Sequence, residues 1–107
     1  MEPVPVLGWV FTGLLFVLTV FSVAAGRGLV PKNHFAGIRF PALMRSDAAW
    51  RAGHAAAVFP AGIAFVVGLA FSVIGIIAPA AQWGSIVAFV GGLIWVVARA
   101  TKAAKSS

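Results

Sequence analysis

The side chains that could do chemistry are concentrated in residues 32–54, which read KNHFAGIRFPALMRSDAAWRAGH. Catalysis needs a convergent acid, base or nucleophile, but the chain has only two acidic residues, Glu2 and Asp47, and no cysteine. His34 and His54 together with Asp47 match no standard metal-ligand spacing. We therefore predict no enzymatic activity, no metal and no cofactor, and we expect this stretch to act by binding.

Several residues of the stretch are candidates for binding a ligand or a partner. Gly37-Ile38-Arg39 followed by Pro41 predicts a rigid turn that presents a guanidinium, which could hold one anionic group through two parallel hydrogen bonds. Alternatively, Arg39 and Arg51 anchor the chain to lipid headgroups, and Trp50 lies in the membrane interface. The full set of binding candidates is Asn33, Gly37, Arg39, Pro41, Ser46, Asp47, Trp50, Arg51 and His54.

Ser46 and Asp47 predict the start of a helix that carries four of these candidates. Ser46 is a good N-cap, and Asp47 suits the positive end of the helix dipole. Asp47, Trp50, Arg51 and His54 then follow at i, i+3, i+4 and i+7, which places them on one face of an amphipathic helical segment. Asp47 and Arg51 also have the spacing of a helical ion pair.

The flanking sequence is apolar enough to place this segment at a membrane. The chain is 62% hydrophobic and 9% charged, and such a small soluble domain could not bury so much apolar surface. Uncharged runs at 4–25, 55–78 and 82–98 predict three transmembrane helices, with the motif loop at 26–54. We expect one all-α membrane domain, with an amphipathic cytoplasmic segment before the second span and a frayed basic tail from Arg99.

The charges predict the orientation of these spans. All eight Lys and Arg residues lie in the loop or the tail, which three spans place on one side of the membrane. The positive-inside rule therefore predicts an outer N-terminus and a cytoplasmic C-terminus. Because no positive region precedes the first span, we expect it to be retained rather than cleaved. The excess positive charge favours anionic lipid headgroups over nucleic acid as a partner.

Two series of small residues predict close helix packing within the membrane. They recur at the i, i+4 spacing of a helix ridge in the second and third spans. The first series is Ala64, Gly68 and Ser72, and the second is Gly84, Ala88 and Gly92. The pattern does not decide between packing inside the chain and packing against a membrane protein partner or another copy.

The order and spacing of the motif residues resemble a known family. Asn33, Gly37-Ile38-Arg39, Pro41, Ser46, Trp50 and His54 are similar to the signature of the SdpI family of small bacterial integral membrane proteins. There an asparagine, a Gly-x-Arg-Thr-Pro turn and a tryptophan lie between two membrane spans. Phe40 stands where the family usually has threonine, so any contact made by that hydroxyl is missing from this chain.

The resemblance implies a protein of the bacterial plasma membrane that acts by binding, in signalling or in a role like toxin immunity, through its cytoplasmic motif. The family's namesake carries additional spans, so these roles are not carried over whole. The alternative is a small accessory subunit whose small-residue ridges pack onto a larger membrane protein complex and stabilise it.

Overall fold

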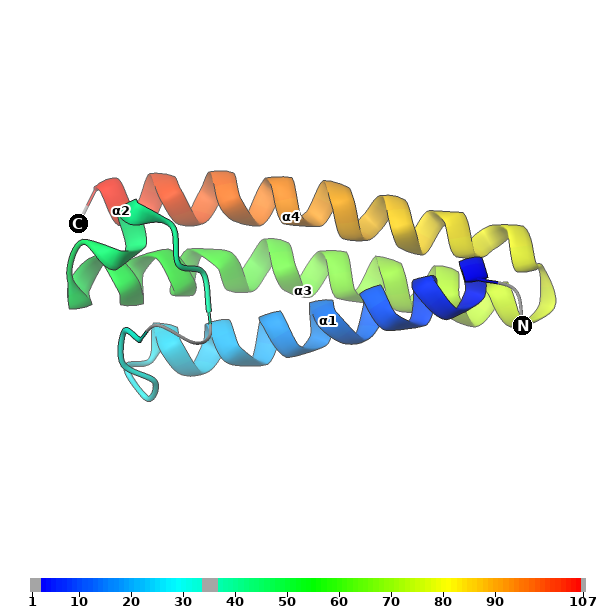
Figure 1. Ribbon diagram of the computed structural model, residues 1–107, viewed down its shortest axis with the longest axis horizontal. Coiled ribbons are helices and arrows are strands. Elements are labelled where there is room, and N and C mark those ends of the chain that lie inside the picture. The colour runs from blue at the N-terminus through cyan, green and yellow to red at the C-terminus, as the bar shows by residue number, and fades with distance from the viewer. Residues whose placement is uncertain (1–2, 34–36, 107) are drawn as a thin grey trace.

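Three long helices run side by side along a bundle whose longest dimension is 45 Å (Figure 1). The computed structural model describes residues 3–33 and 37–106. Its elements, in chain order, are α1 (Pro3–Gly26), α2 (Pro41–Met44), α3 (Asp47–Ile77), the 3-10 turn η1 (Pro79–Ala81) and α4 (Gln82–Lys105). Helices α1, α3 and α4 are each long and apolar enough to cross a membrane, which confirms the predicted all-α membrane protein with three spans.

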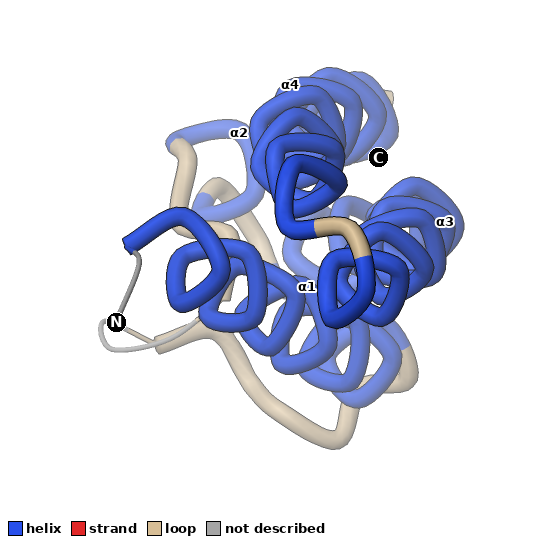
Figure 2. The backbone as a smooth tube through the Cα atoms, turned by 90° about the vertical axis from the view of Figure 1, so that its right-hand side faces the viewer, coloured by secondary structure: helices blue, strands red, loops and turns tan. Residues whose placement is uncertain are grey.

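Helix α3 is the central helix of the bundle. It packs along both α1 and α4, whereas α1 and α4 touch each other less; seen end-on, the three form a triangle (Figure 2). Its 31 residues make it about 46 Å long at 1.5 Å per residue, against a hydrocarbon core of about 30 Å. About a third of α3 therefore extends beyond the hydrocarbon.

The boundary of the second span is the first point at which the structure differs from the prediction. The predicted amphipathic segment, 47–54, and the predicted span from 55 are one helix, which is capped by Ser46 and continuous through Pro60. The predicted polar face is also split, because the preceding loop covers part of it. Asp47 and Arg51 are exposed, whereas Trp50 and His54 are buried.

The basic tail is the second difference. It does not fray: α4 continues to Lys105, because Ala100 and Ala104 are fully buried. Arg45 of the loop also donates a hydrogen bond of 2.7 Å from Nη2 to the Ala104 carbonyl. A guanidinium at this position satisfies a terminal carbonyl and interacts favourably with the negative end of the helix dipole.

The apolar core lies at the end of the bundle that carries α2. Leu43 of α2 is fully buried, and its side chain fills the space where a Cβ on Gly53 of α3 would lie. Most other core residues are alanines, so the helices approach closely around this one large side chain. The cluster consists of Ile38, Leu43, Ala49, Ala57, Ala61, Val96, Ala100 and Ala104.

Hydroxyl groups connect the three helices in the other half of the bundle. Thr12 Oγ1 of α1 lies 3.0 Å from Ser72 Oγ of α3, which lies 2.7 Å from Ser85 Oγ of α4. Ser85 also donates to the Gly68 carbonyl at 2.9 Å, and Gln82 Nε2 donates to the Ser72 carbonyl at 3.0 Å. Such interhelical hydrogen bonds contribute roughly 0.6–2 kcal/mol each in membrane proteins.

Both small-residue ridges form contacts within this one chain, where α3 packs against α1 and α4. Ala64, Gly68 and Ser72 are buried. A Cβ added at Gly92 would collide with the Ala64 Cβ, and one added at Gly84 would collide with the ring of Phe71. The closest approach of α3 and α4 therefore depends on glycine at these positions.

Neighbouring glycines in α4 allow a matched test of this packing. We expect Gly92→Leu to destabilise the bundle by about 1–3 kcal/mol, since overpacking forces helices apart. Gly91→Leu should have little effect, because beyond its chain neighbours and its own helix backbone no atom lies within 4 Å of a Cβ at that position. Thermal unfolding of both variants in detergent, followed by circular dichroism, measures the difference. Equal melting temperatures would contradict the internal α3–α4 contact.

Candidate functional site

All eight Lys and Arg residues lie at one end of the bundle, called here the basic end. They come from the loop before α3, the start of α3 and the last two turns of α4, and the C-terminus lies at the same end in Figure 1. The one acidic residue within the described ranges, Asp47, lies there too. Such a one-sided charge distribution attracts anionic ligands and partners. The basic residues are Arg27, Lys32, Arg39, Arg45, Arg51, Arg99, Lys102 and Lys105.

The loop between α1 and α3 folds back onto the helices instead of extending away from them. Residues 38–40 have no regular secondary structure, and Phe40 is extended, with φ −69° and ψ 151°. Pro41 then begins α2, where its fixed φ suits the first helical position. Figure 1 shows the loop passing from the α1 side of the bundle to α2 beside α4. In place of the predicted rigid turn at 37–41, the structure has a bend at Gly37, three residues without regular secondary structure and the start of α2 at Pro41.

His54 holds this segment against α3. The Ile38 N–H donates to His54 Nε2 at 2.9 Å, and His54 Nδ1 lies 2.8 Å from the Trp50 carbonyl oxygen. Because Nε2 accepts a hydrogen bond, the ring proton is assigned to Nδ1, which donates to Trp50. One ring nitrogen therefore holds the loop, and the other holds the ring against its own helix.

An aromatic cluster surrounds the histidine. The ring centroids of Trp50 and His54 are 4.2 Å apart, and Phe21 of α1 contacts both rings at 6.4 and 5.7 Å. The Trp50 indole N–H donates to the Val30 carbonyl at 3.0 Å. Trp50 is only 1% exposed, so it is not the exposed interfacial anchor that the sequence suggested.

Gly37 is required at this cluster for two reasons. Its φ of +94° lies in the left-handed region that side chains disfavour. An added Cβ would also lie 2.6 Å from Phe21 Cε1, 2.8 Å from Trp50 Cη2 and 3.0 Å from His54 Nε2. The motif glycine, tryptophan and histidine therefore meet in one contact that fixes the loop.

Other predicted site residues take local structural roles. Ser46 caps α3 by accepting a hydrogen bond of 3.0 Å from the Ala49 N–H, as predicted. Asn33 Nδ2 donates to the Pro31 carbonyl at 2.9 Å. Sequence reasoning missed Phe21 and Leu43, because their apolar side chains look the same whether they face lipid or the loop.

Three exposed charged residues line a small hollow of about 140 Å³, called here the charged hollow. Its charged lining residues are Lys32, Asp47 and Arg51, and Trp50 lines it as well. Asp47 and Arg51, both within the described residues, do not form the ion pair that their spacing predicted. The hollow therefore presents two cations and one carboxylate to a ligand.

The described residues contain no group of three or more His, Cys, Asp and Glu side chains that could hold a metal ion. His34, the other histidine considered for such a site, lies outside the described residues.

Comparison with known proteins identifies the family. The family model of the SdpI/YfhL protein family matches residues 30–100, about two-thirds of the chain. The chain belongs to this SdpI/YfhL family. No curated protein and no solved structure matches it. The match in this SdpI-family protein begins in the loop and includes α2, α3 and most of α4, whereas α1 precedes it.

The hydrogen bond from Ile38 to His54 gives a residue-level prediction for this SdpI-family protein. His54→Phe keeps an aromatic ring but leaves the Ile38 N–H without its acceptor, which costs about 1–3 kcal/mol for a buried donor. We expect the Ile38 amide to exchange its hydrogen about tenfold faster or more in this variant, as measured by NMR in micelles.

Phe59→Leu is the control, because Phe59 lies on the same helix but is 62% exposed. It should leave the exchange at Ile38 unchanged. Equal exchange rates in the wild type and His54→Phe would show that His54 does not hold the loop.

Proposed function

We propose that this protein is a non-enzymatic binding and signalling module of the bacterial plasma membrane, which holds an acidic segment of a partner protein at its basic end. The observation that carries the proposal is the placement of every Lys and Arg of the chain at that end. By the positive-inside rule the basic end is cytoplasmic and the N-terminus is outside.

The charged hollow is the part of the basic end best suited to bind a partner. Arg51 projects from the first turns of α3, whose position is fixed by the burial of Trp50 and His54. The Arg51 Cδ packs against Gly28: it lies 3.4 Å from the position that a Cβ on Gly28 would take. Lys32 is held by a hydrogen bond of 3.1 Å from Nζ to the Met44 carbonyl. Cations held in fixed positions lose less entropy when they bind a carboxylate.

The use of His54 supports binding over catalysis. Both of its ring nitrogens hold backbone groups, so neither is available for acid–base chemistry. Signalling and a toxin-immunity-like role, the two that the family resemblance implies, both need a face that captures another polypeptide. The identity of the captured partner distinguishes the two.

A pull-down with the full chain in a gentle detergent tests the proposal. In Lys32→Gln/Arg51→Gln, we expect recovery of the co-purifying partner to fall about tenfold or more, because charge-assisted hydrogen bonds are lost. Lys105→Gln is the control, since it removes a basic residue of the same end that does not line the hollow. Recovery of the wild-type chain as a pure monomer or homo-oligomer would overturn the proposal, as would equal recovery with the double variant.

The second candidate is the small accessory subunit of a larger membrane complex. Exposed apolar side chains support it, such as Val87 and Ile94 of α4 at 69% and 68% exposure. Because the glycine ridges are filled within the chain, a partner would have to pack on these faces instead. A complex that survives Lys32→Gln/Arg51→Gln but dissociates with Ile94→Trp would favour this candidate.

A further inference from the structure

An apolar hollow of about 460 Å³ lies between α1, α4 and the loop, separate from the charged hollow. Leu18 of α1 and Leu93, Val96 and Val97 of α4 line it, together with residues 37–40 of the loop, which include Arg39. Arg39 is the one charged residue in the lining. The hollow therefore combines a lipid-facing apolar surface with a single guanidinium.

The depth of this hollow matches the boundary between hydrocarbon and headgroups. About 20 helical residues cross the hydrocarbon core, so counting back from Ile77, the end of α3, places the boundary near Val58. His54 lies one turn beyond Val58, and it binds the backbone N–H of Ile38, next to Arg39. Arg39 is thus at headgroup level, while Leu18 and Leu93 lie toward the hydrocarbon.

Arg39 is placed to bind an anion that the chain itself does not supply. Its side chain is exposed, and it makes no hydrogen bond or ion pair with the other described residues. Its backbone is nevertheless fixed, by the Ile38 hydrogen bond on one side and the start of α2 on the other. The planar guanidinium that this backbone carries can bind two phosphate oxygens at once.

We propose that this hollow binds one anionic phospholipid, with its phosphate on Arg39 and an acyl chain against Leu18, Leu93 and Val97. This assignment goes beyond the proposed function, because the ligand is a lipid and the residues are not those of the charged hollow. Its occupant is argued from the charge of Arg39, the apolar walls and the matching depth.

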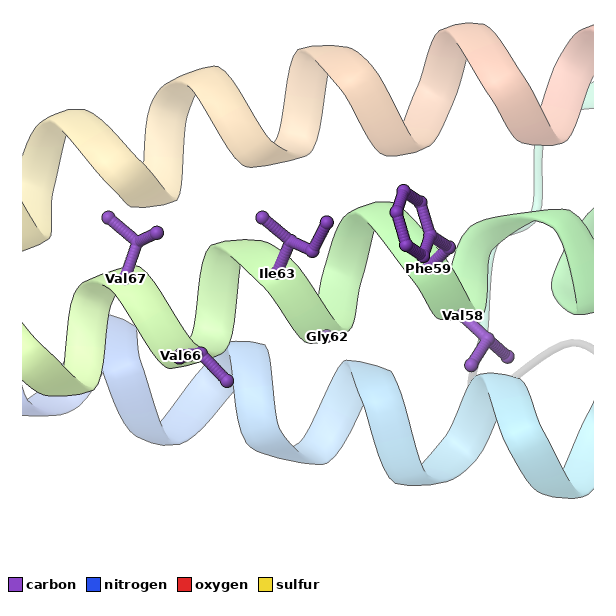
Figure 3. A pocket seen from close by; sticks show the side chains of 6 residues that line it. All are labelled: Val58, Phe59, Gly62, Ile63, Val66 and Val67. Carbon is purple, nitrogen blue, oxygen red and sulfur yellow. The ribbon is translucent and has the colours of Figure 1, made fainter.

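A second apolar hollow has no charged lining residue, so it serves as a comparison for the hollow that contains Arg39. It has about the same volume, 470 Å³, and is lined by α3 alone. Figure 3 shows Phe59, Ile63 and Val67 pointing toward α4, and Val58 and Val66 pointing toward α1. No charged residue lines it, so lipid chains that cover this face are not selected by their headgroups.

Native mass spectrometry of the full chain tests the headgroup contact. The delipidated protein is titrated with phosphatidylglycerol or with phosphatidylcholine of the same acyl chains. We expect one phosphatidylglycerol to be retained, about tenfold more tightly than phosphatidylcholine. Arg39→Gln should remove this preference, and Lys105→Gln should keep it. Absence of the preference in the wild type, or its persistence in Arg39→Gln, would overturn the proposal.

A pair of valine substitutions tests the acyl-chain contact with all charges intact. Val97→Phe fills the hollow and should weaken phosphatidylglycerol retention about tenfold. Val87→Phe makes the same change at a position of α4 that is 69% exposed, and it should not weaken phosphatidylglycerol retention. Equal retention by both variants would contradict the site. Lipid binding measured on the purified chain is independent of whether an acidic protein partner exists, so either proposal can fail without the other.

Discussion

The hydrogen bond from the Ile38 N–H to His54 Nε2 is the constraint on which the basic end depends. Ile38 is buried against the helices, and a buried backbone donor without a partner is costly. Helix α3 uses its own carbonyls for its own helix, so the acceptor has to come from a side chain. His54 provides it, and its other nitrogen is held by the Trp50 carbonyl.

The consequences of this bond extend to the end of α4. Once Ile38 is fixed, Gly37 has to pass beneath the aromatic rings, and Pro41 starts α2 where Leu43 reaches the core. Arg45 follows directly and binds the Ala104 carbonyl, 59 residues away in the sequence. The loop is therefore a structural element that joins all three helices, and buried neighbours fix the backbone that carries its exposed cations.

The two halves of the bundle are held together in different ways. Apolar burial gives little driving force for association between helices in lipid, because the lipid is itself apolar. At the basic end, alanines allow close packing around Leu43 and Trp50. In the other half, Thr12, Ser72 and Ser85 connect one helix to the next by hydroxyl contacts. Hydrogen bonds and close van der Waals contact thus supply much of the association energy that apolar burial supplies in a soluble protein.

Local features of the sequence were enough to predict the helices but not the contacts between them. The uncharged runs predicted α1 to within one residue at each end, and Ser46 predicted the start of α3. The length of α4 was wrong, because its basic last turns are stabilised by the distant Leu43 and Arg45 rather than by their own composition. The environment of Trp50 could not be predicted, since a tryptophan in the membrane interface and one buried under a loop look the same in the sequence.

The central proposal is that the folded loop presents its cations on the cytoplasmic side of the membrane, and single-cysteine labelling tests it most directly. The chain has no cysteine, so Ala80→Cys in η1 and Ser106→Cys after α4 each introduce one exposed thiol. In intact cells, a membrane-impermeant maleimide should label Ala80→Cys, and it should label Ser106→Cys only after permeabilisation. Labelling of Ser106→Cys, but not Ala80→Cys, in intact cells would contradict the account.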